Sequence, residues 1–184
     1  QRPGDNLYSD SVVALDADTG KLKWHFQFTP NDNYDYDAVQ VPVLADITWH
    51  GQPAKVMLWA NRNGFFYVLD RVTGRFLSGT PFVKVNWASS LDERGRPIQT
   101  PQPQGQPTYP GNQGGTNWYP PSFSPRTGLF YFAAWDNYGT VYRSEEVEYQ
   151  PGRIFTGGGF TVVAPVGGAP AVRVGWRGPV NNWT

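Results

Sequence analysis

The feature that most constrains the fold of this chain is a short internal repeat whose two copies lie 54 residues apart. Residues 14–22 and 68–76 align without a gap, and each copy runs from apolar residues through Asp to Thr-Gly-basic and back to an apolar run. Thr127 and Gly128 lie a further 54 residues on, between flanks that match less well. A unit of roughly 50 residues holding about four short strands has the size of one propeller blade.

The composition favours a chain built from strands. Glycine (21) and proline (17) are abundant and aromatic residues make up 16%, which is typical of short strands joined by tight turns. We expect strands at residues 11–16, 22–28, 41–47, 55–59, 65–70 and 129–135, and another that opens at Phe76. The predicted fold is all-β. About three blades cannot close a ring that typically needs about 4–8, so we expect residues 1–184 to be a partial propeller domain of a longer chain.

One segment, residues 95–115, does not fit this pattern. It carries five prolines, at positions 97, 101, 103, 107 and 110, and therefore cannot form a regular central strand. A plain linker is one interpretation. A loop of this length is also longer than most connections in compact domains, which favours a functional excursion over one face of the scaffold.

Charge and hydropathy exclude some classes of function. Lys+Arg and Asp+Glu each number 15, so bulk charge does not favour nucleic acid or a membrane surface as a partner. No apolar run approaches the roughly 18 residues of a membrane-spanning helix, and residues 1–6 do not resemble a signal peptide. The chain has no cysteine, so disulfides and thiolate metal sites are excluded within it.

The strongest candidate for a site is the acidic stretch at residues 31–37, Asn-Asp-Asn-Tyr-Asp-Tyr-Asp. In an extended chain, the side chains of Asp35 and Asp37 lie on one face, with Cα atoms about 6.5–7 Å apart. Two carboxylates so placed repel each other, and a bound cation would compensate them. A solvated acidic turn is the alternative that the residues alone leave open.

Several blocks of the sequence together resemble the pyrroloquinoline quinone (PQQ)-dependent alcohol dehydrogenases, which are eight-bladed propellers with tryptophan-docking repeats. The blocks occur in the same order as in the family. They are residues 4–8, Ala14-Leu15-Asp16-x-x-Thr19-Gly20-Lys21-x-x-Trp24, Asp32-x-Tyr34-Asp35-Tyr36-Asp37, residues 61–71, residues 81–88, and Gly114-Gly115-Thr116-Asn117-Trp118. The resemblance runs from about residue 4 to residue 160. It implies the same fold and, for a full-length enzyme, the same cofactor.

The resemblance assigns the cofactor contacts residue by residue. Asp35 matches the family's catalytic aspartate, the general base, although Tyr34 stands where the family has Trp. Arg62 matches the basic residue beside the quinone carbonyls, and Asn117 and Trp118 match the pair that contacts PQQ. Arginine suits this role because its fork of donors cannot be deprotonated.

The metal ligands follow from the same resemblance. Asp35 is expected to bind the metal ion, either Ca²⁺ or a lanthanide. Asp37 matches the extra aspartate of the lanthanide-using branch, and one more hard, negative oxygen ligand favours a trivalent ion. The Glu and Asn that complete the family's metal site are expected upstream of this chain.

The implied reaction is the oxidation of an alcohol to an aldehyde, with hydride passing to PQQ and electrons passing on to a cytochrome c. The resemblance also implies a periplasmic location, and a homodimer is an option for the full-length enzyme. The identity of the alcohol, and the presence of a haem domain, cannot be read from these residues.

Two other functions remain open. A non-enzymatic propeller of the outer-membrane assembly type would share the repeats but has no need of Asp35, Arg62 and Asn117 together. A glycoside hydrolase needs paired carboxylates across a cleft, and the clustered glutamates are Glu145, Glu146 and Glu148.

Other conspicuous residues are expected to be structural. Asp32 is predicted to orient local backbone and Trp24 to pack between blades. His25 and His50 lack metal-ligand spacing and are predicted to be surface or packing residues.

Overall fold

The computed structural model describes residues 3–155, 157–163 and 171–179, which form strands and turns and no helix. The strands are β1 (Ser11–Leu15), β2 (Leu22–Gln27), β3 (Val43–Trp49), β4 (Gln52–Ala60), β5 (Phe65–Asp70), β6 (Phe76–Pro81), β7 (Ala88–Leu91), β8 (Pro97–Gln99), β9 (Ser122–Ser124), β10 (Leu129–Asp136), β11 (Gly139–Ser144), β12 (Gly158–Val163) and β13 (Ala171–Pro179). The all-β prediction is confirmed. The described residues include no helix of the length and apolarity that crossing a bilayer requires.

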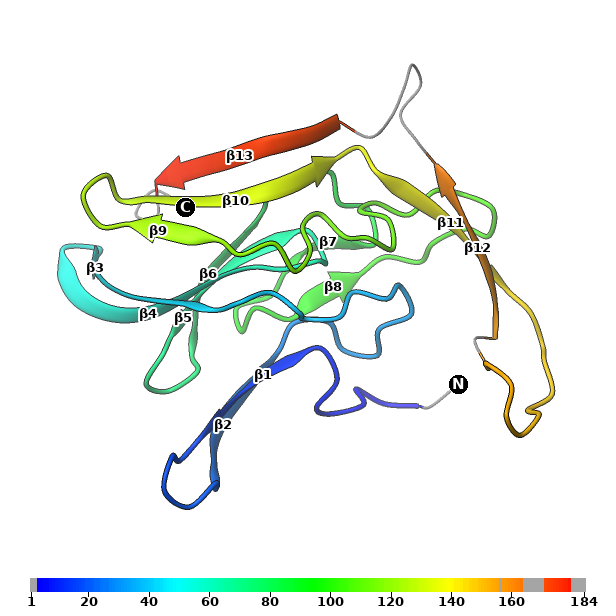
Figure 1. The fold of residues 1–184 in the computed structure, drawn as a ribbon, viewed down its shortest axis with the longest axis horizontal. Helices are drawn as coiled ribbons and strands as arrows, with labels where there is room; N and C mark the ends of the chain where they lie inside the picture. The colour runs from blue at the N-terminus through cyan, green and yellow to red at the C-terminus, as the bar shows by residue number, and fades with distance from the viewer. Residues whose placement is uncertain (1–2, 156, 164–170, 180–184) are drawn as a thin grey trace.

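The strands form successive antiparallel sheets in chain order (Figure 1). The β1–β2 hairpin comes first, then a four-stranded meander in the order β3-β4-β5-β6, and then a three-stranded sheet in the order β13-β10-β9. Two hairpins, β7–β8 and β11–β12, flank them. One complete four-stranded sheet between two smaller sheets is the arrangement expected of neighbouring propeller blades.

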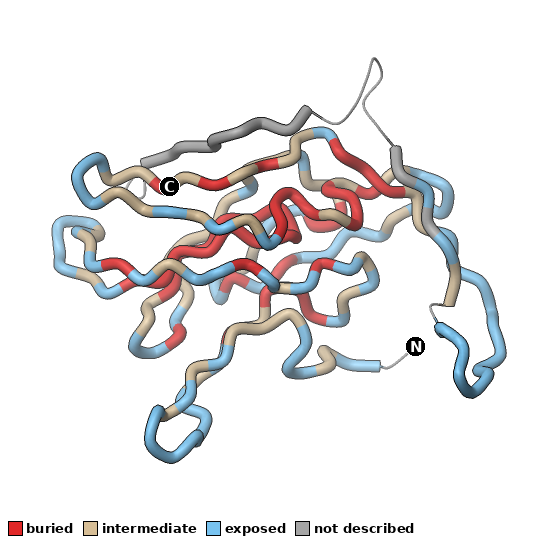
Figure 2. Tube along the Cα trace, in the orientation of Figure 1, coloured by how far each residue is buried: buried red, intermediate tan, exposed pale blue. Residues whose placement is uncertain are grey.

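Both faces of the four-stranded sheet are buried, because its two central strands alternate between two hydrophobic cores. In β5, Phe65, Tyr67 and Leu69 pack toward the β1–β2 hairpin, while Phe66 and Val68 pack toward β10. Alternation follows from the pleat, which sends successive side chains to opposite faces. The buried residues accordingly gather in the centre of the molecule, and the hairpin tips are exposed (Figure 2).

The two repeat copies form the same turn. Asp16 and Asp70 each use Oδ1 to accept the backbone N–H groups two and three residues on. Gly20 and Gly74 close the turns with φ of +68° and +75°, a region that glycine enters without steric cost. The third, weaker copy also turns, since the N–H of Gly128 donates to the carbonyl of Ser124 at 2.8 Å.

The repeat also explains how adjacent sheets dock. The six-membered ring of Trp24 lies against Gly74 of the next sheet, where an added Cβ would approach the indole to 2.6 Å. The prediction that Trp24 packs between blades is therefore confirmed. His25 and His50 are exposed and contact the rings of Tyr8 and Trp49, as expected for packing residues.

One predicted boundary was wrong. The turn between β3 and β4 is tighter than expected, because His50 and Gly51 both adopt positive φ and close a two-residue hairpin. Residues 95–115 include one short strand, β8, which pairs only with β7 among the described strands, so they form no central strand, as predicted.

Candidate functional site

Arg62 lies in the tight turn between β4 and β5, which the flanking asparagines fix. The N–H of Asn61 donates to the carbonyl of Phe65 at 3.0 Å, and the N–H of Asn63 donates to Asn61 Oδ1 at 3.0 Å. Trp87 Nε1 donates to the Asn63 carbonyl at 2.8 Å. A surface turn was the ordinary expectation for such a sequence, yet the Arg62 side chain is only 7% exposed.

The guanidinium of Arg62 meets three oxygen acceptors. Nη2 donates to Asp35 Oδ2 at 3.3 Å and also to the backbone carbonyl of Asn112. Nη1 donates to Asp37 Oδ2 at 3.2 Å. The Nε atom is buried and has no hydrogen-bond partner within the part of the chain that the structure describes. The structure therefore brings together three residues that the sequence had singled out separately, Asp35, Asp37 and Arg62.

Asp32 shapes the acidic loop, as predicted. Its Oδ1 accepts the N–H of Tyr34 at 2.8 Å and its Oδ2 accepts the N–H of Tyr36 at 2.7 Å. The expected extended geometry is wrong at Asp35, whose φ is +67°. The two carboxylates still converge on Arg62, since each accepts a hydrogen bond from its guanidinium.

Two tyrosine hydroxyl groups hold the acidic loop, one against the segment that follows β8 and one against β11. Tyr36 is fully buried, and its hydroxyl donates to the Pro110 carbonyl at 2.5 Å. The hydroxyl of Tyr142 in β11 donates to the Tyr34 carbonyl at 2.7 Å. The rings of Tyr34 and Tyr36 both pack against Trp87. Residues 95–115 thus support the site, which agrees with an excursion rather than a plain linker.

Asn117 and Trp118 lie on the segment that packs on the Arg62 backbone. The N–H of Gly115 donates to the Arg62 carbonyl at 2.8 Å, and Gly114 lies so close that a Cβ would meet Arg62 Cβ at 2.7 Å. The Asn117 amide donates to Gln113 and accepts from the backbone of Trp118. The Trp118 side chain is 64% exposed and stacks on Tyr119. PQQ contact by Asn117 and Trp118 stays a prediction.

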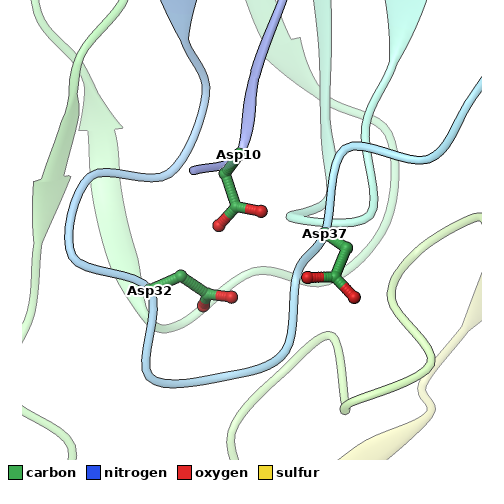
Figure 3. Close-up of side chains that lie close together, drawn as sticks. All are labelled: Asp10, Asp32 and Asp37. Carbon is green, nitrogen blue, oxygen red and sulfur yellow. The ribbon is translucent and has the colours of Figure 1, made fainter. Parts of the chain in front are cut away.

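Asp10 joins the site although sequence reasoning missed it. Oxygen atoms of Asp10, Asp32 and Asp37 all lie within 4.8 Å of one another (Figure 3). Asp10 precedes β1 and the other two lie on the loop after β2, so their proximity depends on the tertiary fold. Asp10 adopts a positive φ of +47°, and no pattern in the sequence predicts this.

Several carboxyl groups of the site have raised pKa values. Burial, followed by the charge of Asp32, raises the pKa of the Asp10 carboxyl to about 8. Burial also raises the pKa of Asp32, although the backbone N–H groups of Tyr34 and Tyr36 oppose the increase. The pKa of Asp35 is raised by burial, lowered by the Arg62 guanidinium, and raised again by Asp37, with a net increase. Burial is therefore the main cause of the raised pKa values, and the charges of neighbouring carboxylates add to it.

The Asp10 carboxyl gives a pH-dependent stability. Its pKa is about 8 in the folded protein, against an ordinary value of 3.8. Between these values the folded state binds a proton that the unfolded state releases, so stability falls as pH rises through this range. We expect Asp10→Asn to flatten the decline in the free energy of unfolding between about pH 4 and 8.

Urea unfolding of the full-length protein at a series of pH values, with a chelator present, measures this difference. Asp18→Asn, an exposed aspartate in the β1–β2 turn, is the matched control and should follow the wild-type curve. Parallel curves for wild type and Asp10→Asn would show that Asp10 ionises normally in the folded state.

The rival carboxylates and one sizeable hollow lie elsewhere. Glu145, Glu146 and Glu148 are exposed in the loop between β11 and β12 (Figure 1). A hollow of about 640 Å³ is lined by residues of β3, β4 and the β9–β10 turn and by no predicted site residue. Neither supports a glycosidase-like pair of acids across a cleft.

The family model for PQQ, described as the glucose/ethanol/alcohol dehydrogenase β-propeller domain, matches residues 1–107. The quinohemoprotein alcohol dehydrogenase of Comamonas testosteroni is 53% identical over 135 residues, covering 71% of this chain and 19% of that relative. The 1-butanol dehydrogenase (cytochrome c) of Thauera butanivorans is 45% identical over 166 residues, covering 86% of this chain and 24% of that relative.

A solved structure, of a europium-containing methanol dehydrogenase, superposes with a TM-score of 0.77 at 38% identity. The matched region covers 86% of this chain and 28% of the solved chain. The chain thus spans about a fifth to a quarter of the length of the two curated relatives. The sheet arrangement is therefore similar to that of the solved methanol dehydrogenase over most of this chain.

Proposed function

The chain belongs to the PQQ family of glucose, ethanol and alcohol dehydrogenases with a β-propeller domain, and from this premise we propose that it forms part of a PQQ- and metal-dependent enzyme that oxidises an alcohol to an aldehyde. The observation that carries the proposal is the convergence of Asp35 and Asp37 on the Arg62 guanidinium. Residues 1–184 supply one sector of the site, and the remaining sectors belong to a longer protein.

The residues present fit a metal ion. The side chains of Asp35 and Asp37 are 62% and 60% exposed, so their oxygen atoms are open to a further ligand. Carboxylate oxygens are the donors that hard cations prefer. Among the described residues, the carboxylates of Asp35 and Asp37 share one guanidinium, that of Arg62, so a cation would offset the excess negative charge of the pair.

The residues also fit an anionic quinone. The Arg62 side chain is almost fully buried, and three acceptors hold its guanidinium in place. Its Nε–H has no acceptor among the described residues. A guanidinium fixed in this way offers preorganised donors to carbonyl oxygens, which costs little reorganisation when charge develops on them.

When both groups are bound, PQQ supplies the hydride acceptor and the metal ion supplies the Lewis acid. Asp35 would accept the hydroxyl proton of the alcohol, and its raised pKa makes it a stronger base than an ordinary aspartate. Arg62 would hold the cofactor carbonyls, and Asp37 would hold the metal ion beside Asp35. Asn117 and Trp118 are proposed to contact PQQ from the later segment, and the large exposed fraction of Trp118 leaves its ring available for that contact.

Asp37 is proposed to favour a lanthanide over calcium. It adds a carboxylate beside Asp35, and the superposed solved relative is named as europium-containing. We expect Asp37→Ala to weaken lanthanide binding by about 100-fold and calcium binding by much less, because a trivalent ion gains more from each added negative ligand. Titration of the metal-free full-length protein with La³⁺ and Ca²⁺ measures both affinities.

Asp46→Ala is a matched control, since Asp46 is an exposed aspartate paired with Arg71 on another part of the surface. It should leave both metal affinities unchanged. An equal loss of lanthanide and calcium binding in Asp37→Ala would mean that Asp37 does not select between the ions.

The electron acceptor is proposed to be a cytochrome c, and the location periplasmic. The acceptor rests on the Thauera relative, whose name specifies cytochrome c, and on the quinohemoprotein relative. The location, like the homodimer, rests on the family resemblance. A non-enzymatic scaffold is the alternative, and it gives no reason for burying Arg62 between two accessible carboxylates and a carbonyl.

The proposed function is tested with the full-length protein, PQQ and either La³⁺ or Ca²⁺. We expect the visible absorbance of PQQ to shift on binding and primary alcohols to reduce cytochrome c. A protein that leaves the PQQ spectrum unchanged with both metals would be a scaffold and not a dehydrogenase.

A further inference from the structure

Strand β11 presents a row of hydroxyl groups behind the candidate site. Thr140 and Tyr142 are two residues apart in β11 and therefore share one face, and Tyr138 lies two residues before Thr140. The hydroxyl groups of Tyr138 and Thr140 donate to Asn112, whose carbonyl contacts Arg62. The hydroxyl group of Tyr142 donates to the carbonyl of Tyr34, the residue before Asp35. We propose that this face of β11 is a positioning element, in which Thr140 sets the Arg62 guanidinium and Tyr142 sets the loop that carries Asp35.

The first half of this element acts through Asn112. The Thr140 hydroxyl donates to Asn112 Oδ1 at 3.1 Å and accepts the Asn112 N–H at 3.0 Å. The Tyr138 hydroxyl donates to the same Oδ1 at 2.9 Å. With its side chain and its N–H both held, Asn112 turns its carbonyl toward Arg62 Nη2.

These groups are buried, which makes the arrangement stiff. Thr140 is fully buried and Asn112 is 6% exposed. The backbone of Thr140 also bridges to Thr108 in both directions, at 2.9 and 3.0 Å. Gly111 leaves no room for adjustment, because a Cβ there would approach the Thr140 hydroxyl to 2.6 Å. A buried polar group that loses its partner is costly, so Asn112 has few alternative orientations.

The second half acts on the acidic loop. The Tyr142 hydroxyl donates to the Tyr34 carbonyl at 2.7 Å, immediately before Asp35. The two rings also meet edge to face, with centroids 5.6 Å apart. Asp35 has a φ of +67°, a conformation that costs free energy in most residues and persists when its surroundings hold it. Tyr142 supplies part of that hold from outside the loop.

The consequence is that one strand controls both members of the catalytic pair. Nη2 of Arg62 is shared between Asp35 and the Asn112 carbonyl, so a rotation of Asn112 would change the Asp35 contact as well. Small displacements of a general base and a cofactor donor reduce rate strongly when the remaining geometry is preorganised. This inference rests on the proposed function.

The test uses the full-length protein with four variants. Thr140→Val removes the hydroxyl at similar size, Thr140→Ser retains it, and Tyr142→Phe keeps the ring contact but removes the donor. The double variant Thr140→Val/Tyr142→Phe measures coupling. Trp59→Phe is the control for loss of a buried side-chain donor, since the Trp59 side chain is buried and its Nε1 donates to Gln40 at 3.2 Å.

Two quantities are measured beside thermal stability, namely the PQQ dissociation constant from absorbance titration and kcat. We expect Thr140→Val to weaken PQQ binding by about 5- to 10-fold, which corresponds to one lost hydrogen bond, and Thr140→Ser to restore it. Tyr142→Phe should lower kcat by about 10-fold with a smaller change in PQQ affinity, because a hydrogen bond to the base loop is lost. In the double variant, the fold-loss of kcat and of PQQ affinity should each be smaller than the product of the two single-variant losses.

The outcomes separate the two claims. If wild type neither binds PQQ nor oxidises alcohols, the proposed function fails and the positioning role falls with it. If wild type does both and the Val and Phe variants match it in affinity and kcat, the positioning role alone is wrong. Equal losses in Thr140→Val, Thr140→Ser and Trp59→Phe would also overturn it, since general destabilisation would then explain the effect.

Discussion

Replacing Asp35 with asparagine in the full-length enzyme should lower kcat by about 1,000-fold, within the usual contribution of a general base. Asparagine has nearly the same shape and tolerates the left-handed conformation at φ of +67°, so the loop should keep its course. It can accept a hydrogen bond from Arg62 but cannot take a proton from an alcohol. The steady-state rate of alcohol-dependent cytochrome c reduction measures the effect.

PQQ affinity must be measured in the same variant, because Asp35 is also a proposed metal ligand. We expect it to change much less than kcat when the metal ion is saturating. Asp18→Asn, an exposed aspartate in the first hairpin, serves as control and should show wild-type kinetics. An Asp35→Asn enzyme that kept more than about a tenth of the wild-type kcat would place the general base elsewhere.

Replacing Arg62 with methionine should weaken PQQ binding by about 100-fold, the upper range for losing hydrogen bonds to a charged group. The guanidinium is buried and ties Asp35, Asp37 and the Asn112 carbonyl together. Without it the two carboxylates face each other uncompensated. Arg62→Lys should give an intermediate affinity, since an ammonium keeps the charge but cannot reproduce a planar fork with three acceptors.

Arg71→Met is the control for losing a guanidinium. Arg71 also bonds a backbone carbonyl and an aspartate, Ala45 and Asp46, but it lies at the other end of β5, in the turn to β6. It should leave PQQ affinity unchanged. Wild-type affinity in Arg62→Met, measured by absorbance titration, would remove Arg62 from the cofactor site.

Local sequence patterns predicted the blades well because a blade is built from local signals. The Asp-x-x-Thr-Gly turn satisfies its own backbone through the Asp16 and Asp70 carboxylates, so it forms wherever it occurs. The β-prone apolar run at residues 65–70 predicted the strand that the structure shows as β5. The boundaries of β3 and β4 were less predictable, since His50 enters positive φ only because the flanking strands pair to the end of the hairpin.

The site was predictable only in part, because its contacts join distant segments. Asp35, Asp37 and Arg62 could be found from their family blocks, and the structure confirms that they meet. Asp10 and the carbonyl of Asn112 could not be found, since one depends on the entry path into β1 and the other is a backbone group. The bend at Asp35 was likewise hidden, because it arises from hydrogen bonds made by Asp32 and Tyr142 outside the peptide that bends.

The central claim is that Asp35, Asp37 and Arg62 hold a hard metal ion and PQQ together. Anomalous diffraction from crystals of the full-length protein grown with PQQ and a lanthanide tests it most directly. We expect one strong peak about 2.3–2.6 Å from carboxylate oxygens of both Asp35 and Asp37, the range for hard cations of this size, with PQQ carbonyl oxygens beside the Arg62 guanidinium. A lanthanide peak that touches neither carboxylate, or PQQ bound away from Arg62, would contradict the account.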